Sequence, residues 1–583
     1  MSDAKYKLTV GLEVHAELRT KTKMFCDSKN DPDETRPNAN VCPICTGHPG
    51  TLPAINKEAV KYVIKVGMAV GGKIADFTEF DRKNYFYPDI PKGYQISQYK
   101  YPLVSGGELH GVRLTRIHLE EDTGSSAHGS GSFLPFLKGE ERILGAPQDS
   151  LSSTLGEPKS GQLQSGVPEG GGILKSSGSE ALATSFKKGG IKETEIGERG
   201  EKWEYSFVDF NRAGLPLMEL VTEPVIHSAK EAGDFGKEFQ LLLRYLNVSE
   251  ADMEKGQLRV EANISVAMSP SLLSRGGIEG GGVKDQLPSA SADLGTSPRL
   301  RGGGEKLGTK VEVKNLNSFR AMERAIAYEY ERQVAQLEAG ERVIQETRGW
   351  DEAKQKTFSQ RAKEDSHDYR YFPDPDLPKL RISEIPEFGE EILKKEMPEL
   401  PDEKRKRYTE EYGIKSEDIE IFIADFSLQN LFEKSVVPKL GGDKKLIQLA
   451  SNYITNDLVK IAGGKGEVLE RIKDNFADLV KMAGAGEISS RGAKDILAEM
   501  ALEGGDPRKI AEAKNLFQKS DPEALKKVVA EIISANLKVV ADYKGGKEAS
   551  LQYLVGQGMK ATKGSANPEV LKKMLIEEIR RSH

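Results

Sequence analysis

Cysteines are scarce in this sequence, and long apolar runs are absent from it. The 583 residues include 3 cysteines. Such a low and odd count excludes a disulfide framework and is typical of proteins in a reducing compartment. No run of about 18 apolar residues occurs, which excludes a membrane-spanning helix, and the N-terminus lacks the apolar core of a secretory signal. We therefore expect a soluble, cytoplasmic protein that makes no contact with a membrane.

The sequence also lacks a large excess of charge of either sign. Its 84 basic and 90 acidic residues leave a net charge of −6 at pH 7. This balance excludes a uniformly basic surface of the kind that coats nucleic acids. Any contact with RNA must therefore be a local patch.

The composition changes along the chain. Up to about Pro386 the sequence is rich in glycine, aromatic and β-branched residues, whereas helical patterns follow from about Met397. Two later helices are predicted to begin at Asp521-Pro522 and Asn567-Pro568, because an N-cap residue followed by proline is typical of a helix start. We predict an α+β fold with a mixed, β-rich domain at 1–395, a helical domain at 396–505 and a small all-α domain at 506–583.

Two segments of the β-rich domain differ from their surroundings. Residues near 130–203 and 269–304 are rich in glycine, serine and proline and show no sustained periodicity. We predict that both are mobile surface insertions. Their glycines do not form a phosphate-binding loop, because no Gly-Lys-Ser/Thr sequence follows a strand and opens a helix.

The first predicted strand, Lys7–Thr20, carries ionisable side chains on one face. Apolar residues alternate along it, while Glu13, His15 and Glu17 fall on the opposite face. One interpretation is the solvated face of an antiparallel sheet. The other is a metal or proton-transfer site, since side chains two positions apart on a strand are separated by roughly 6.5–7 Å and can converge on one ion.

Further acidic residues stand in strand-like segments later in the chain. In "RIHLEEDTGSSAH", Glu120, Glu121 and Asp122 would repel one another unless a cation or a basic partner lies beside them. Glu219 lies within the apolar run "PLMELVTEP", where an acid is costly unless it is paired or bound to a metal. Together with Glu13 these residues indicate a shared site.

Cationic residues accompany these acids. The segment "DRKNYFYPDIPKGYQISQY" contains Arg82, Lys83 and Tyr85, and it is either a buried aromatic corner or a surface that contacts phosphate and stacks bases. In "TKVEVKNLNSF", Lys310 and Lys314 stand on one face of a predicted strand. Lysines in such positions could neutralise a phosphate during its transfer.

Seven segments together resemble one protein family. They read "GLEVHAEL", "CPICTGHPGTLPAINKEAV", "DRKNYFYPDIPKGYQISQY", "HLEEDTGSS", "DFNRAGLPLMELVTEP", "KNLNSFRAMERAIAYE" and "DYRYFPDPDLP". These long, non-degenerate strings are similar to those of the B subunits of aspartyl/glutamyl-tRNA(Asn/Gln) amidotransferases, the GatB/GatE family, and they occur in the same order. The resemblance covers nearly the whole chain apart from the two insertions, and "YLVGQGMKATKGSANPEVL" is similar to the tail domain of that family.

The resemblance implies an activity, its cofactors and its partners. A B subunit of this family binds tRNA misacylated with Glu or Asp, and its cradle domain, here 1–395, uses ATP and Mg²⁺ to phosphorylate the side-chain carboxylate. Ammonia released from glutamine by the amidase (A) subunit then displaces phosphate, which leaves Gln-tRNA(Gln) or Asn-tRNA(Asn). The implied assembly is a heterotrimer with this amidase and a small (C) subunit. The tail domain, here 506–583, would bind tRNA through Lys547, Lys560 and Lys563.

The resemblance also implies site residues. Matching motif to motif, the Mg²⁺ ligands would be His15, Glu121 and Glu219, with Glu13 beside them as a fourth catalytic residue. Strict alternation would place Glu120 on the face of His118, so the choice of Glu121 requires a bulge or a strand end nearby. Because phosphoryl transfer to a carboxylate brings two anions together, we expect further residues to bind ATP or the tRNA end. These are Arg82, Lys83, Tyr85, Lys310, Lys314 and Asn315.

The cysteines indicate a separate metal site. Cys26, Cys42 and Cys45 include a Cys-Pro-Ile-Cys knuckle, whose spacing favours structural zinc over nucleophilic catalysis. The resemblance implies a fourth cysteine two residues after Cys26, where this chain has Ser28. Two alternatives stay open: zinc bound by three thiolates with a further ligand from Asp27, Asp31 or His48, or no zinc.

Two other classes of function also stay open. The chain could hydrolyse glutamine itself through a Cys/His pair, although its cysteines have knuckle spacing and the Gly-Gly-Ser-Ser-Gly-Gly amidase signature is absent. It could instead be a non-catalytic platform for tRNA, although the acidic motifs favour catalysis. The sequence does not distinguish Glu-tRNA(Gln) from Asp-tRNA(Asn) as the substrate.

Overall fold

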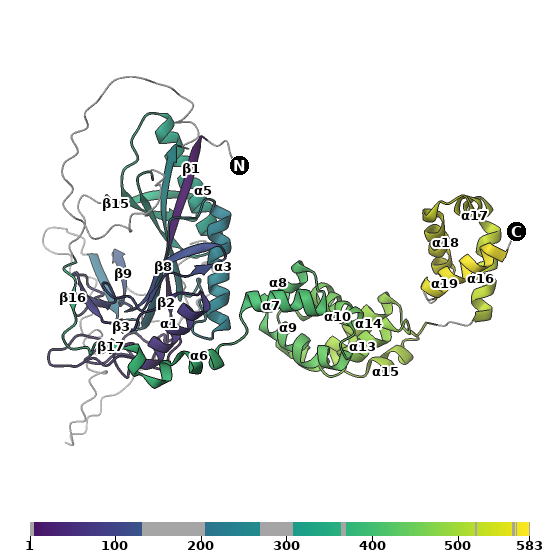
Figure 1. The fold of residues 1–583 in the computed structure, drawn as a ribbon, viewed down its shortest axis with the longest axis horizontal. Helices are drawn as coiled ribbons and strands as arrows, with labels where there is room; N and C mark the ends of the chain where they lie inside the picture. The colour runs from purple at the N-terminus through teal and green to yellow at the C-terminus, as the bar shows by residue number, and fades with distance from the viewer. Residues whose placement is uncertain are drawn as a thin grey trace, which may run out of the picture. The chain divides into compact units, whose positions relative to one another are not determined.

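A sheet of thirteen strands forms the centre of the N-terminal part of the protein (Figure 1). The computed structural model describes residues 5–130, 204–268, 307–362, 369–518, 522–562, 566 and 568–581. The two predicted insertions therefore lie outside the described residues, apart from Ser130. Residue contacts divide the chain into two units, Met1–Pro398 and Glu399–His583. This single division leaves the domain limits predicted at residues 395 and 505 as predictions.

The large sheet is mostly antiparallel, with one parallel pair between β13 and β14. In spatial order its main path is β15 (Lys356–Ala362), β14 (Glu346–Asp351), β13 (Val311–Leu316), β12 (Leu258–Met268), β1 (Tyr6–Glu17), β11 (Pro216–Thr222), β8 (Val112–Glu121), β5 (Tyr94–Ser97), β4 (Asp81–Asn84) and β16 (Phe372–Pro373). The short strands β2 (Lys73–Ile74), β6 (Val104–Ser105) and β7 (Glu108–Leu109) join it beside β8. Two small pairs stand apart, β9 (Ser125–Ser130) with β10 (Glu204–Asp209) and β3 (Phe77–Thr78) with β17 (Leu380–Arg381).

Strand β1 lies in the middle of this sheet and shows the alternation that its sequence predicts. Val10, Leu12, Val14 and Ala16 are almost fully buried, as an apolar face packed into a core requires. β1 pairs with β12 on one side and β11 on the other, both antiparallel. Its second face therefore borders the second faces of β11, β8 and β12, which brings residues far apart in sequence together.

Four α-helices belong to the described residues of the N-terminal unit. They are α1 (Lys57–Ala69), α3 (Ala229–Tyr245), α5 (Phe319–Glu338) and α6 (Glu390–Glu396). Asn56, Ser228 and Ser318 cap the first three, because each side chain accepts hydrogen bonds from backbone amides of the first turn. α5 packs on β12 and α3 packs on α5 (Figure 1), with Phe235 and Met322 among the buried residues.

The second unit is helical throughout its described residues, apart from an isolated bridge between Ile488 and Phe517. Its α-helices are α7 (Pro401–Arg407), α8 (Ser416–Ala424), α9 (Phe426–Asn430), α10 (Lys444–Tyr453), α11 (Val459–Ala462), α12 (Gly466–Ile472), α13 (Phe476–Gly484), α14 (Ser490–Glu503), α15 (Pro507–Ala513), α16 (Pro522–Ala535), α17 (Leu537–Lys544), α18 (Glu548–Ala561) and α19 (Pro568–Arg581). The predicted starts at Pro522 and Pro568 are confirmed. The last four helices share an apolar core that includes Leu525, Leu554 and Leu571. A sheet-rich part followed by helices confirms the predicted α+β class.

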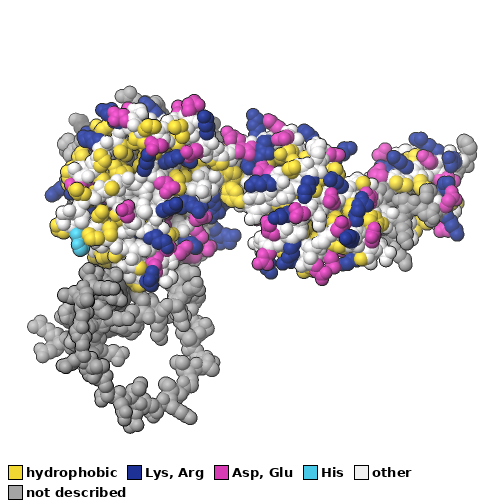
Figure 2. Space-filling model, turned by 90° about the horizontal axis from the view of Figure 1, so that it is seen from below, with side chains coloured by type: hydrophobic (Ala, Val, Ile, Leu, Met, Phe, Trp, Pro, Cys, Tyr) yellow, Lys and Arg dark blue, Asp and Glu magenta, His cyan; other side chains and the backbone are white. Residues whose placement is uncertain are grey.

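Basic and acidic side chains are interspersed on the face that Figure 2 presents. Within the described residues of that face, neither sign forms an extended area of its own, as the balanced composition predicts. Among the helices in the described ranges, none combines the length and the apolar character that crossing a membrane requires.

Candidate active site

The open face of β1 meets two neighbouring strands at one cluster of ionisable side chains. His15 on β1 is the register partner of Glu219 on β11, and Glu219 is the register partner of His118 on β8. Side chains that lie directly opposite each other in antiparallel strands point to the same face. The sheet therefore carries these three residues in one row, and Glu13 and Glu120 stand two positions along from His15 and His118.

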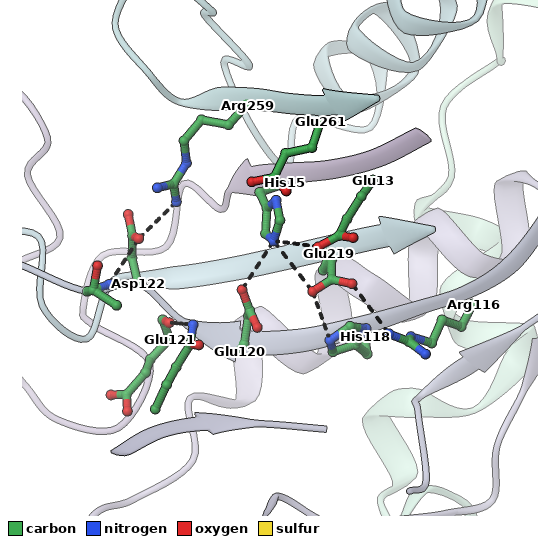
Figure 3. A network of polar contacts seen from close by, with 12 residues as sticks. Glu13, His15, Arg116, His118, Glu120, Glu121, Asp122, Glu219, Arg259 and Glu261 are labelled. Carbon is green, nitrogen blue, oxygen red and sulfur yellow. Dashed lines mark hydrogen bonds and ion pairs between the residues drawn. The ribbon is translucent and has the colours of Figure 1, made fainter. Parts of the chain in front are cut away.

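Within this cluster the polar atoms are close enough to interact (Figure 3). The His15 Nε2 atom is 3.4 Å from Glu219 Oε2, 3.6 Å from Glu120 Oε1 and 3.8 Å from Glu13 Oε1. The His118 Nε2 atom is also 3.4 Å from Glu219 Oε2. On the outer side Arg116 Nη2 is 3.5 Å from Glu219 Oε1. Glu219 is therefore the point at which the donors of β1 and β8 converge.

Burial and mutual contacts shift the pKa values of these groups in different directions. Burial alone would raise the pKa of Glu219, but the neighbouring His118 and His15 imidazoles outweigh it and hold this pKa well below its usual range. Burial would lower the pKa of His15, but its hydrogen bond to Glu219 and the surrounding carboxylates raise it to about 9. Burial lowers the pKa of His118 to about 4, and burial together with the Glu219 charge raises the pKa of Glu13 to about 7.

The donor set fits a divalent cation. Two groups of three donors, Glu13 with His15 and Glu219, and His118 with Glu120 and Glu219, each have ligand atoms within 4.8 Å of one another. Mg²⁺ prefers carboxylate oxygens and binds through one or two of them while it keeps water or phosphate ligands. The buried carboxylates of Glu120 and Glu219 and the half-buried one of Glu13 repel one another on this face, and a bound cation would relieve that repulsion. The residues present therefore fit Mg²⁺.

Glu121 does not belong to this cluster, which corrects the assignment made from its motif. Its carboxylate forms an ion pair with Lys92 and accepts a hydrogen bond of 2.9 Å from the backbone amide of Ile96. Of the two features that this assignment required, a bulge is absent, because the β8–β11 register is regular from Arg116 to Glu121, whereas a strand end is present, because β8 ends at Glu121. Strict alternation therefore holds, and Glu120 occupies the position expected of Glu121.

Lys83 and the tyrosines near it line the side of the cluster next to Glu120. The pKa of Lys83 is raised well above its usual range, since the charges of Glu120 and Glu219 outweigh the effect of burial. The Lys83 Nζ atom lies over the Tyr369 ring, 5.2 Å from its centroid, and the Tyr85 ring contacts the same ring edge-on. Lys83 therefore adds a positive charge close to the carboxylates.

Arg82 has different surroundings from Lys83, because adjacent residues of β4 point to opposite faces. Its guanidinium forms ion pairs with Asp374 at 2.8 Å and Asp376 at 2.9 Å, and it stacks on Tyr94. Within the described residues no contact connects Arg82 with the cluster, and its predicted role in binding ATP or the tRNA end stays a prediction.

The predicted residues around β13 are only partly brought to the site. Lys314 Nζ is 2.9 Å from Glu261 Oε2, and Glu261 is the register partner of Glu13. Lys314 therefore lies beside the Glu13 end of the cluster. Lys310 is exposed just ahead of β13, and Asn315 donates a hydrogen bond to the Trp350 carbonyl with a positive φ of 64°. Neither of these two residues contacts the cluster in the described structure.

Four residues of this region were not assigned as site residues from the sequence. His118 and Glu120 were detectable, because alternation from Arg116 places both on one face of β8. Arg212 and Arg259 were not, since each reaches Asp122 only through the folded sheet, at 2.7 Å and 2.8 Å. Sequence periodicity gives no information on such long-range contacts.

The three cysteines come together as their spacing predicts. One sulfur each from Cys26, Cys42 and Cys45 lies within 4.8 Å of the others. Asp27, Asp31 and His48 are not part of this group among the described residues. The fully buried Lys23 lies beside the thiols, with its Nζ atom 3.9 Å from Cys45 Sγ and 2.7 Å from the Ala213 carbonyl oxygen. Three sulfur ligands at these distances fit a zinc ion with one further open position.

Two of the three predicted tail lysines belong to the described residues. Lys547 and Lys560 are exposed, and Lys547 Nζ is 3.7 Å from Asp542. Lys563 lies outside the described residues. Their predicted contact with tRNA stays a prediction.

Two family models match the chain. A model described as the GatB/GatE catalytic domain matches residues 8–137, 190–280 and 289–386. A second, described as a GatB domain, matches residues 431–579. Together they cover the sheet-rich unit and most of the helical unit.

Curated relatives are similar over nearly their whole length. Three of them are named as the B subunit of an aspartyl/glutamyl-tRNA(Asn/Gln) amidotransferase. The relative from Crocosphaera subtropica is 36% identical, over 97% of this chain and 96% of its own. The relative from Thermotoga maritima is 37% identical over 98% of both chains, and the relative from Persephonella marina is 36% identical over 98% of this chain and 99% of its own.

Proposed function

The chain belongs to the GatB/GatE family, and from this premise we propose that it is the B subunit of an aspartyl/glutamyl-tRNA(Asn/Gln) amidotransferase. Its reaction is the tRNA-dependent amidation of Glu-tRNA(Gln), Asp-tRNA(Asn) or both. The side-chain carboxylate is first phosphorylated by ATP, and ammonia then replaces the phosphate. The observation that supports this reaction most directly is the convergence of His15, His118 and three carboxylates at Glu219.

In this proposal the cluster holds Mg²⁺ through His15, Glu120 and Glu219, with Glu13 beside them. Bound there, Mg²⁺ would supply the positive charge that lets phosphate oxygens approach a carboxylate. Lys83 lies at the same edge and adds a second positive charge, which stabilises the transferring phosphoryl group. Arg116 pairs with the outer oxygen of Glu219 and so orients that carboxylate toward the imidazoles.

The chain's own residues also limit water at this site. His118 and Glu120 are almost fully buried, and Glu219 is close to it. An acyl phosphate is hydrolysed by water in competition with amidation, so a site with little room for solvent favours the amide product. Glu13 is only half-buried, and its pKa of about 7 suits exchange of a proton near the incoming ammonia.

The relatives are named as one subunit of an enzyme, which supports an assembly of several chains. We propose that the partners are an amidase (A) subunit, which releases ammonia from glutamine, and a small (C) subunit, in a heterotrimer. The tail helices would contact the misacylated tRNA, with Lys547, Lys560 and Lys563 as candidate contacts. A cytoplasmic location, where aminoacyl-tRNA is made, forms part of the same proposal.

We also propose that Cys26, Cys42 and Cys45 bind structural zinc. The support is their mutual distance and the buried Lys23, which compensates part of the thiolate charge. Because Ser28 stands where the family has a fourth cysteine, one position would be open to water or a weaker ligand.

The test is ATP hydrolysis by the assembled enzyme with ammonium as the nitrogen source. The proposal predicts that phosphate release depends on Glu-tRNA(Gln) or Asp-tRNA(Asn) and stops in a Glu219→Gln variant that folds normally. A purely tRNA-binding platform would bind the tRNA without hydrolysing ATP. A glutaminase would release ammonia from glutamine without the amidase partner, and neither result is compatible with the proposal.

A further inference from the structure

A second polar network lies next to the cluster, and Asp122 is its centre. Asp122 follows β8 directly and is 3% exposed in its side chain. Its Oδ2 atom accepts a hydrogen bond of 2.7 Å from Arg212, and its Oδ1 atom accepts one of 2.8 Å from Arg259. Arg212 also forms an ion pair with Glu17, at the end of β1. Two carboxylates thus alternate with two guanidinium groups.

Both carboxylate oxygens of Asp122 have guanidinium partners, which argues against a second role for Asp122 as a metal ligand. Each of its carboxylate oxygens already accepts a hydrogen bond, Oδ2 from Arg212 and Oδ1 from Arg259. A carboxylate shared by two guanidinium groups has both oxygens occupied and is poorly placed to bind a cation as well. Its function in the fold is therefore to hold the two arginines.

Arg259 differs from Arg212 in its exposure and in the number of carboxylates that it pairs with. It lies on β12 as the register partner of His15, so both side chains rise from the same face of the sheet (Figure 3). The Arg259 side chain is 43% exposed, whereas that of Arg212 is 24% exposed and spans two carboxylates. Among the described residues, hydrogen bonds from Arg259 reach Asp122 alone, through Nη2.

A guanidinium group presents five N–H donors in a rigid fork that matches a carboxylate or a phosphate. Anchoring by one nitrogen restricts the orientation of the fork and leaves the other donors to bind a ligand. This arrangement reduces the conformational entropy that a free arginine would lose on binding an anion. A purely structural ion pair would instead be expected to use both nitrogens on one carboxylate or to lie away from the metal-ligand cluster.

We propose that Arg259 binds an anionic group of the substrates, either phosphate oxygens of the nucleotide or the carboxylate that is to be phosphorylated, and that Asp122 is the positioning residue that holds its guanidinium. This inference rests on the proposed function and adds the group that aligns the two anions. The Arg259 charge would offset the repulsion between phosphate and carboxylate beside His15, whereas Lys314 and Glu261 lie beside Glu13. The shared chemistry is a bidentate contact with two anionic oxygens.

The experiment compares Arg259→Gln and Arg259→Lys in the assembled enzyme, with steady-state kinetics in ATP and in misacylated tRNA measured separately. Arg259→Gln is expected to lower kcat/KM by about tenfold or more, since a hydrogen bond to a charged group is lost. A rise in KM for ATP would identify the phosphate as the ligand, and a rise in KM for the aminoacyl-tRNA or a fall in kcat would identify the carboxylate. Arg259→Lys retains the charge without the fork and should recover part of the loss.

The matched control is Arg324→Gln on α5, because Arg324 is similarly exposed and also forms an ion pair, with Glu352. It should leave all kinetic constants unchanged. Thermal unfolding of each variant separates loss of folding from loss of function. If Arg259→Gln folds and keeps wild-type constants for both substrates, the inference is wrong. If the wild-type enzyme itself shows no ATP-dependent amidation, the proposed function fails instead.

The positioning role of Asp122 needs a readout of its own. In Asp122→Asn the side chain keeps its acceptor oxygen but loses the charge that orients both arginines. If Asp122 acts through Arg259, Asp122→Asn should change the same KM or kcat as Arg259→Gln, and the double variant should be no worse than Arg259→Gln alone. Additive effects of the two substitutions would contradict a positioning role.

Discussion

His15 and Glu219 lie directly opposite each other on the antiparallel strands β1 and β11, and the His15 Nε2 atom is 3.4 Å from Glu219 Oε2. The same carboxylate oxygen is 3.4 Å from His118 on the next strand. One buried acid is thus flanked by two imidazoles, and two further carboxylates stand within reach. These contacts explain how the apolar strand β11 can accommodate an acid. The residues opposite Glu219 on the two neighbouring strands, His15 and His118, are polar and point to the same cluster.

Glu120 and Glu121 are adjacent in sequence, but only Glu120 belongs to the cluster, so their substitutions should have different effects. Glu120→Gln removes a metal donor, so it should weaken Mn²⁺ binding, used as a spectroscopic substitute for Mg²⁺, by at least about tenfold. Glu121→Gln should leave Mn²⁺ affinity unchanged and lower the free energy of unfolding by about 3 kcal/mol, because it breaks a buried ion pair with Lys92. Electron paramagnetic resonance titration and chemical unfolding measure the two effects. Loss of Mn²⁺ binding in Glu121→Gln with full binding in Glu120→Gln would reverse the assignment.

Metal affinity should depend on pH through His15. Without a metal its pKa is raised from about 6.5 to about 9, so the imidazole is protonated at pH 7. The stability that this proton contributes is fully present below about pH 6.5 and is lost as the pH rises through about 9. A metal ligand must be deprotonated, so apparent Mn²⁺ affinity should rise by about tenfold per pH unit between pH 7 and 9.

Calorimetry in two buffers of different ionisation enthalpy checks this directly. Metal binding at pH 7.5 should release about one proton from the wild-type protein and less from His15→Asn. An affinity that stays constant from pH 7 to 9, without proton release, would mean that His15 is not a ligand.

The cysteine site should bind zinc more weakly than a four-cysteine site. Metal analysis of the purified protein is expected to find about one zinc per chain, and a chelator should remove it readily because one position is open. Ser28→Cys should slow that removal, and Cys45→Ser should abolish zinc binding. Protein that lacks zinc even after Ser28→Cys and zinc-supplemented growth would show that the three thiols serve another purpose.

The tail lysines can be tested by the salt dependence of tRNA binding. Each phosphate contact contributes about 0.7–0.9 to the slope of log affinity against log salt concentration. Lys547→Ala and Lys560→Ala should each reduce that slope by roughly this amount and leave ATP hydrolysis at saturating tRNA unchanged. Lys230→Ala, an exposed lysine on α3 that pairs with Asp234, is the control and should have no effect. Unchanged slopes in both tail variants would exclude these lysines as phosphate contacts.

The sequence predicts the strands of this site better than the contacts between them. Alternation placed Glu13 and His15 on one face of β1, and the same rule applied to β8 selects Glu120, which the structure confirms. The motif match favoured Glu121 because a motif records which residues are adjacent but not which face each one occupies. When the alternation of side chains along the strand is given more weight than the motif match, Glu120 is selected for the face of His118.

The network around Asp122 shows where sequence reasoning ends. Arg212 is 90 residues from Asp122 and Arg259 is 137 residues from it. Only the order of strands, with β12 and β11 on the two sides of β1, brings these side chains together. A similar limit applies to the adjacent residues Arg82 and Lys83. Sequence reasoning assigned both cations the same predicted role, but they point to opposite faces of β4 and only Lys83 lies near the cluster.

The most direct test of the central claim follows the oxygen atoms of the substrate. If the Glu219 cluster serves phosphorylation of the carboxylate, ¹⁸O placed in the side-chain carboxylate of Glu-tRNA(Gln) must appear in the inorganic phosphate that amidation releases. Mass spectrometry of that phosphate should show one ¹⁸O per product formed by the wild-type enzyme and no labelled phosphate from a folded Glu219→Gln variant. Amidation that releases unlabelled phosphate, or labelled phosphate at the wild-type rate from the variant, would contradict the account.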